Sequence, residues 1–251
     1  ITEFKEDLDS EGVPNSPENF EYLFEQHSVF TFKENLKRLV EATNGIIPRN
    51  SRFQPSDKEL SFLEDAPARF SDAMVSEEYA AAERNLITRM EAVKPEILKA
   101  ALIGNAKKRG DTIEQLITGQ CVDHELGDII QPLGIGAELV IDVKTKLLNR
   151  ASAPKAYNVD KFLRLLAQTN SVFAFFMIGI DTEQGTVSGR LLTVLDDTLR
   201  NLTVVQHHWA GRGSRGVTQL SGNFGRALSP NYHSSICIES AKSFLKGLIN
   251  R

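Results

Sequence analysis

A buried-strand pattern that two charges interrupt, at residues 139–146, constrains the fold of this chain most. The run is apolar and rich in β-branched side chains, and it follows a glycine-containing turn, which are the usual composition and boundary of a strand. Residues two apart on a strand point to the same face, so Asp142 and Lys144 lie side by side while Val143 faces the other way. Burying a charge is costly unless the charge is paired or binds a metal. We therefore interpret this strand as a candidate site.

Asp128 lies upstream of this strand at a spacing that suits the neighbouring strand of a hairpin. With Asp142 and Lys144 it forms a pattern that resembles the PD-(D/E)xK nuclease superfamily, whose motif is Pro-Asp, a spacer, then Asp or Glu, any residue and Lys. Type II restriction endonucleases and several DNA-repair nucleases share that motif. Gly127 stands where the family commonly has proline, a position that the family often varies.

The resemblance implies phosphodiester hydrolysis that depends on Mg²⁺, a hard cation that prefers oxygen ligands. Asp128 and Asp142 would bind the cation, and the Val143 carbonyl would be a further ligand. Lys144 would orient the attacking water or help to deprotonate it. In some members of that family a glutamate on the helix before the first strand helps to bind the metal, and Glu114 would have this role here. An equally good interpretation is that Glu114 is a solvent-exposed glutamate on its helix. An ion pair at a surface edge is the alternative for Asp142 and Lys144.

A glycine- and arginine-rich segment, residues 211–226, suits contact with DNA. Its five glycines allow close backbone approach, and its three arginines can bind guanine edges or phosphates. The candidate DNA-binding residues are Arg212, Ser214, Arg215, Thr218, Gln219, Asn223 and Arg226. The segment loosely resembles the glycine-rich recognition loop of the blunt-cutting, EcoRV-like restriction enzymes. A flexible basic loop that contacts only phosphates is the alternative.

Charge is unevenly distributed along the chain. The formal net charge is −4, but residues 144–251 contain 14 Lys and Arg against 6 Asp and Glu, whereas residues 1–143 contain 15 against 27. We therefore expect a polyanion to bind to the half that follows the motif. Ordinary fluctuation of charge along a sequence is the alternative explanation.

The composition is that of an ordinary globular protein. The 251 residues are 41% hydrophobic and 25% charged, and no apolar run reaches the length of a membrane span. The first residues do not resemble a signal peptide. Cys121 and Cys237 lack the spacing of a metal site, so we expect reduced thiols and a cytoplasmic location.

Hydrophobic periodicity predicts both helices and strands, and the resemblance implies that they form an α/β (α+β) fold with a central mixed β-sheet flanked by helices. Expected helices begin near Pro17 and lie at 31–43, 76–93, 95–105, 111–118, 159–168 and 240–250, and strands beyond the motif at 172–180, 190–195 and 203–206. Residues 46–67 contain three prolines and are expected to be mostly loop, with a short helix near 58–63. Residues 1–105 are interpreted as a mostly helical region that serves dimerisation or holds the DNA. Residues 106–251 are interpreted as a restriction-endonuclease-like core.

The sequence therefore predicts a Mg²⁺-dependent, sequence-specific endonuclease for double-stranded DNA, acting as a homodimer on a palindromic site. Two alternatives remain open: a DNA-repair or junction-resolving nuclease, and a non-catalytic DNA-binding protein on the same fold. An exonuclease is less favoured, because Gln168 is followed by Val172 where the Gln-x-x-x-Tyr motif has tyrosine.

Overall fold

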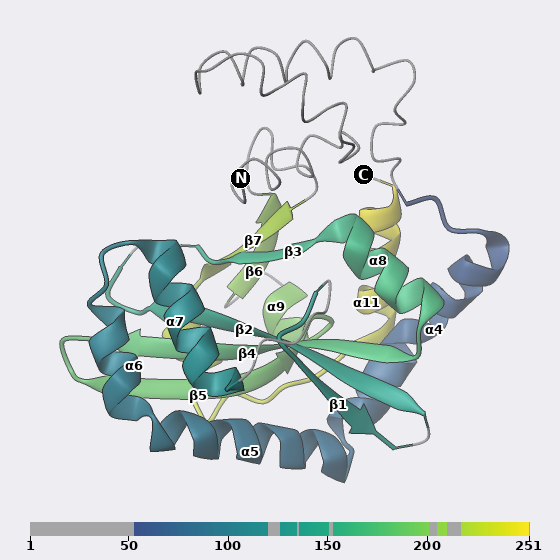
Figure 1. Ribbon diagram of the computed structural model, residues 1–251. Coiled ribbons are helices and arrows are strands. Elements are labelled where there is room, and N and C mark those ends of the chain that lie inside the picture. The colour runs from purple at the N-terminus through teal and green to yellow at the C-terminus, as the bar shows by residue number, and fades with distance from the viewer. Residues whose placement is uncertain are drawn as a thin grey trace, which may run out of the picture. The chain divides into compact units, whose positions relative to one another are not determined.

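The computed structural model describes residues 53–119, 126–134, 136–150, 153–200, 205–209 and 217–250 (Figure 1). Contacts divide the chain into two compact units, residues 1–54 and 55–251. The second unit contains every helix and strand discussed below, and the helices expected near Pro17 and at 31–43 lie outside the described residues. No helix in the described ranges is long and apolar enough to cross a membrane.

A four-stranded mixed sheet forms the centre of this unit. Its strands, in spatial order, are β1 (Ile129–Leu133), β2 (Ala137–Leu147), β4 (Ser171–Asp181) and β5 (Thr186–Thr193). The outer pairs are antiparallel, whereas β2 and β4 are parallel. Two parallel neighbours need a crossover connection, and helix α8 (Val159–Gln168) provides it. The predicted mixed sheet is confirmed.

Helix α8 begins where its sequence predicts. The Asn158 side chain accepts a hydrogen bond from the Lys161 backbone N–H and so caps the first turn. The apolar face of the helix, including Phe162, is buried against the sheet. This cap and this face fix the position from which β4 re-enters the sheet beside β2.

The two faces of β4 are covered by different helices, because alternate residues of a strand point to opposite faces. On one face the Phe173 ring lies 5.9 Å from the ring of Phe162 in α8. On the other, Phe176 and Met90 both approach Gly189, where an added Cβ would lie 2.7 Å from the Met90 sulfur. Met90 belongs to helix α5 (Glu77–Ala92). The sheet is therefore flanked by helices on both faces, as predicted.

The remaining described elements complete the unit. The helices are α4 (Asp57–Met74), α6 (Lys94–Ala101), α7 (Ala106–Thr118), α9 (Asp197–Arg200), α10 (Phe224–Ala227) and α11 (Ile238–Ile249). A second, three-stranded antiparallel sheet has the order β3 (Lys155–Asn158), β7 (Val217–Gly222), β6 (Val205–Trp209). In Figure 1, α7 lies beside β2 and close to the start of β1.

The short helix expected near 58–63 is present but is longer than expected, because α4 begins at Asp57 and continues through Pro67 to Met74. The loop expected over residues 64–67 is therefore wrong, and residues 46–52 lie outside the described residues. Ser56 and Glu59 form a capping box that starts the helix. A buried face that includes Leu63 and Phe70 then offsets the hydrogen bond that the proline removes. Tertiary packing overrides the local helix-breaking signal here.

Candidate active site

Asp142 and Lys144 lie side by side on one face of β2, as the two-residue alternation requires. The Lys144 ammonium lies 2.7 Å from Oδ1 and 2.6 Å from Oδ2 of Asp142. Asp142 is only 7% exposed, and β2 is an interior strand between β1 and β4. The Lys144 ammonium also lies 5.9 Å from the centre of the Phe175 ring. The alternative of an ion pair at a surface edge is therefore wrong, because this pair is buried.

Asp128 immediately precedes β1 and is held against the centre of β2. Its backbone N–H donates to the Ile141 carbonyl at 2.8 Å, and its Oδ2 accepts a hydrogen bond from the Val143 N–H at 2.7 Å. The Val143 side chain is buried on the opposite face. Asp128 and Asp142 thus come from adjacent strands of one hairpin. A role for the Val143 carbonyl as a cation ligand stays a prediction.

Gly127 explains how Asp128 can approach β2 so closely. A Cβ at this buried position would lie 2.4 Å from Val140 Cγ1 and 3.2 Å from the Ile141 carbonyl oxygen. The absence of a side chain lets the backbone that leads into β1 lie directly on β2. The glycine that replaces the usual proline of the motif therefore has a packing role in this chain.

Glu114 extends from α7 toward the same carboxylates. Its pKa is raised to about 7, chiefly by burial and also by the neighbouring charges of Asp128 and Asp111, while Lys144 opposes the shift. A hydrogen bond to the Asp128 carboxyl also favours the protonated form of Glu114. The interpretation of Glu114 as a solvated glutamate is not supported, because the side chain faces two members of the candidate site.

Asp142 has the more strongly perturbed carboxyl group. Its pKa is raised to about 8: burial is the largest cause, Lys144 opposes the shift, and the charge of Asp128 adds to it. Asp128 thus interacts with the carboxyl groups of both Glu114 and Asp142, and Lys144 is the cation that opposes both pKa shifts, so a fully ionised cluster would carry excess negative charge. Such perturbed acids favour a functional role over a purely structural one.

These carboxylates fit a hard divalent cation by their chemistry. A bound Mg²⁺ commonly takes only one or two carboxylates and retains several waters, and it would offset the charge that raises the pKa values of Glu114 and Asp142. Within the described ranges, no three His, Cys, Asp or Glu side chains are grouped as a ready-made metal site. Asp128 and Asp142 instead bind the Val143 N–H and the Lys144 ammonium, so a cation would compete with these contacts.

The DNA-binding candidates occupy unlike positions. Arg212, Ser214 and Arg215 lie outside the described residues. Thr218 is 3% exposed and its hydroxyl donates to the Tyr157 carbonyl at 3.3 Å, so it is buried structure and not a DNA contact. Residues 217–222 form β7 and residues 224–227 form α10, so this part of the predicted recognition loop is regular structure.

The other three candidates remain closer to the surface. Gln219 is half-buried on β7, opposite Lys155 of β3. The Asn223 side chain is exposed, but its Oδ1 accepts a hydrogen bond from the Arg226 N–H and caps α10. The Arg226 guanidinium lies 5.9 Å from the centre of the Tyr232 ring. Gln219 and Arg226 can still reach a ligand, whereas Asn223 already has a capping role.

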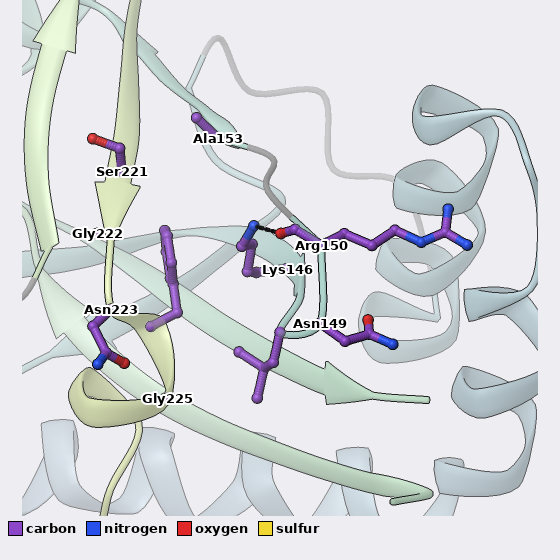
Figure 2. A pocket seen from close by; sticks show the side chains of 10 residues that line it. Lys146, Asn149, Arg150, Ala153, Ser221, Gly222, Asn223 and Gly225 are labelled. Atoms are coloured by element: carbon purple, nitrogen blue, oxygen red, sulfur yellow. Dashed lines mark hydrogen bonds between the residues drawn. The ribbon is translucent and has the colours of Figure 1, made fainter. Parts of the chain in front are cut away.

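Lys146 is a residue that the sequence reasoning missed. It follows Lys144 by two positions and so shares its face of β2. It is 7% exposed, and its ammonium donates to the Arg150 carbonyl (Figure 2). The two-residue alternation that places Asp142 and Lys144 on one face of the strand predicts the same face for Lys146.

Comparisons with protein-family models, with curated proteins and with solved structures gave no match for this chain. Its site is therefore interpreted from its own geometry and from the motif.

Proposed function

We propose that this protein is a Mg²⁺-dependent endonuclease of double-stranded DNA with a restriction-endonuclease-like core. One observation carries the proposal: Asp128, Asp142 and Lys144 come together at one hairpin, and the Lys144 ammonium contacts the carboxyl group of Asp142, which is 7% exposed. The spacing of these residues is that of the PD-(D/E)xK motif. Buried ionisable groups that gather in this way favour chemistry over packing.

The order of elements gives the proposal further support. Helix α7 is followed by the hairpin β1–β2, by the short strand β3 of the second sheet, by the crossover helix α8 and by the parallel strand β4. With β3 set aside because it belongs to the other sheet, the central sheet and its helices follow the helix, strand, strand, helix, strand order that the resemblance predicts for a nuclease core. The acidic pair lies on the hairpin and Glu114 on the preceding helix, again as the resemblance implies.

Each residue has a distinct role in the proposed reaction. Asp128 and Asp142 would hold Mg²⁺, which when bound activates water and neutralises charge on a phosphate. Lys144 orients the attacking water beside the phosphate and stabilises the negative charge that develops there. Glu114, whose pKa is raised to about 7, is suited to hold or release a proton close to neutral pH.

The particular enzyme proposed is a type II restriction endonuclease that acts as a homodimer. Two copies related by a two-fold axis would cut both strands of a palindrome. The basic balance of residues 144–251 supports DNA as the substrate.

Supercoiled plasmid incubated with Mg²⁺ tests the proposal, with EDTA as the control. Discrete linear fragments are the expected result. Nicking, or cleavage confined to branched DNA, would replace the restriction enzyme with a repair or junction-resolving nuclease. A gel shift without any cleavage would leave a DNA-binding protein and overturn the nuclease assignment.

A further inference from the structure

A pocket of about 710 Å³ adjoins the candidate active site (Figure 2). It lies between the turn that follows β2 and the junction of β7 with α10. Its lining includes Lys146, Asn149, Arg150, Asn223, Phe224 and Gly225. Two of its described lining residues are cationic and none is acidic. The composition of the pocket therefore suits an anion.

The Lys146 ammonium is held in place before any ligand arrives. It donates to the Arg150 carbonyl and lies 5.8 Å from the centre of the Phe224 ring. Figure 2 shows this ammonium turned toward the backbone of Arg150, whereas the Arg150 side chain extends away from it. Burial lowers the pKa of Lys146, which means that its charge has lost part of its hydration.

The pocket lies along the same strand as the candidate active site. Lys146 and Lys144 are two residues apart on one face of β2, a separation of roughly 6.6 Å at the usual rise of a strand. Successive phosphates of a DNA strand advance by about 3.4 Å along the helix axis, so this separation corresponds to about two phosphates. A strand whose scissile phosphate lies at Lys144 therefore brings a phosphate one or two positions away within reach of Lys146.

We propose that this pocket binds a phosphate group of the same DNA strand, one or two positions from the phosphate that is cleaved, with Lys146 as the cation that positions it. The inference rests on the proposed nuclease function, because it takes the ligand to be the polynucleotide. Lys146 acts here as a positioning residue and takes no part in the bond-breaking step.

Two substitutions test the pocket. Lys146→Gln removes its buried charge. Gly225→Asp adds an opposing charge at the wall without touching Lys146: Gly225 is exposed, and a Cβ there meets only Asn223 Oδ1, at an ordinary 3.6 Å. Gly247→Asp is the matched control, since Gly247 is an exposed helical glycine of α11 with open space around its Cβ. Circular dichroism establishes that each variant is folded.

Affinity for a fluorescent duplex is measured in EDTA over a range of salt concentrations. One lost phosphate contact reduces the slope of log K against log salt by about 0.9, and Lys146→Gln is expected to show that loss. Gly225→Asp is expected to weaken binding about tenfold, by analogy with other lost charge contacts, while Gly247→Asp binds as the wild type does. If Lys146→Gln does not fold, the comparison of duplex affinity between Gly225→Asp and Gly247→Asp tests the pocket by itself.

The outcomes separate this inference from the proposed function. If the wild type cleaves DNA and the variants keep its affinity and its slope of log K against log salt, the pocket does not bind a DNA phosphate. The nuclease assignment then stands and this inference fails. Pocket-dependent binding without cleavage by the wild type supports the pocket and overturns the nuclease. Absence of DNA binding by the wild type overturns both. A last outcome is that inorganic phosphate raises the Tm of the wild type but not that of Lys146→Gln, while both variants bind the duplex as the wild type does. The pocket then binds free phosphate, and the inference is overturned.

Discussion

Replacing Asp142 with asparagine should change how the stability of this protein depends on pH. In the folded protein Asp142 has a pKa of about 8, against 3.8 as the ordinary value for aspartate, chiefly because it is buried. Its folded-state pKa is raised, so its contribution to stability is complete below about pH 4 and is lost as the pH rises toward 8. The asparagine variant has no carboxyl group at this position to titrate, so it should not lose this stability as the pH rises.

The size of the effect follows from proton linkage. Between about pH 5.5 and 7.5 the folded state retains a proton that the unfolded state has released, which costs about 1.4 kcal/mol per pH unit. Over this range the wild type should therefore lose about 2–3 kcal/mol relative to Asp142→Asn. For a domain of this size that corresponds to a difference of roughly 4–12 °C in Tm.

Thermal unfolding of both proteins, in EDTA at a series of pH values, measures this difference. The Tm of Asp142→Asn minus that of the wild type should increase with pH. Glu138→Gln, which removes an exposed acid from the same strand, is the matched control and should follow the wild type. Parallel curves for Asp142→Asn and the wild type would show that Asp142 is ionised throughout this range, and the reasoning about its burial would be refuted.

Three further predictions concern the architecture of the site. Gly127→Ala places a Cβ 2.4 Å from Val140 Cγ1 and should destabilise the protein by about 1–3 kcal/mol, with reduced cleavage because Asp128 is displaced; an unchanged denaturation midpoint would contradict the tight contact. Asn158→Ala removes the cap of α8 and should cost about 1 kcal/mol in urea unfolding, whereas Asn158→Asp should retain most of that stability. Excess MgCl₂ should raise the Tm of the wild type more at pH 7.5 than at pH 5.5, since cation binding must displace protons from Asp142, and an equal rise in Asp142→Asn would contradict this site.

Local patterns were sufficient for several parts of the fold. The two-residue alternation placed Asp142 and Lys144 on one face of β2, because strand geometry fixes that relation whatever the tertiary contacts. The amphipathic run after Asn158 gave α8 over the residues expected. The uninterrupted apolar run of β4 indicated a strand covered on both faces, and β4 lies between β2 and β5.

Other features depend on contacts between distant parts of the chain. Glycine and arginine content made residues 217–222 resemble a loop, but their pairing with β3 and β6 makes them a strand and buries Thr218. The approach of Glu114 to Asp128 depends on how α7 packs beside β2. Neither relation follows from spacing along the sequence. Lys146 differs, because the alternation of β2 already placed it beside Lys144.

Single-turnover cleavage of a labelled duplex, with binding measured on the same samples, tests the central claim most directly. Asp142→Ala and Lys144→Ala should each abolish Mg²⁺-dependent cleavage while duplex binding stays measurable, because most positioning contacts lie elsewhere on the protein. Cleavage at the wild-type rate by either variant would contradict the assignment of the buried Asp142–Lys144 pair as the centre of the reaction.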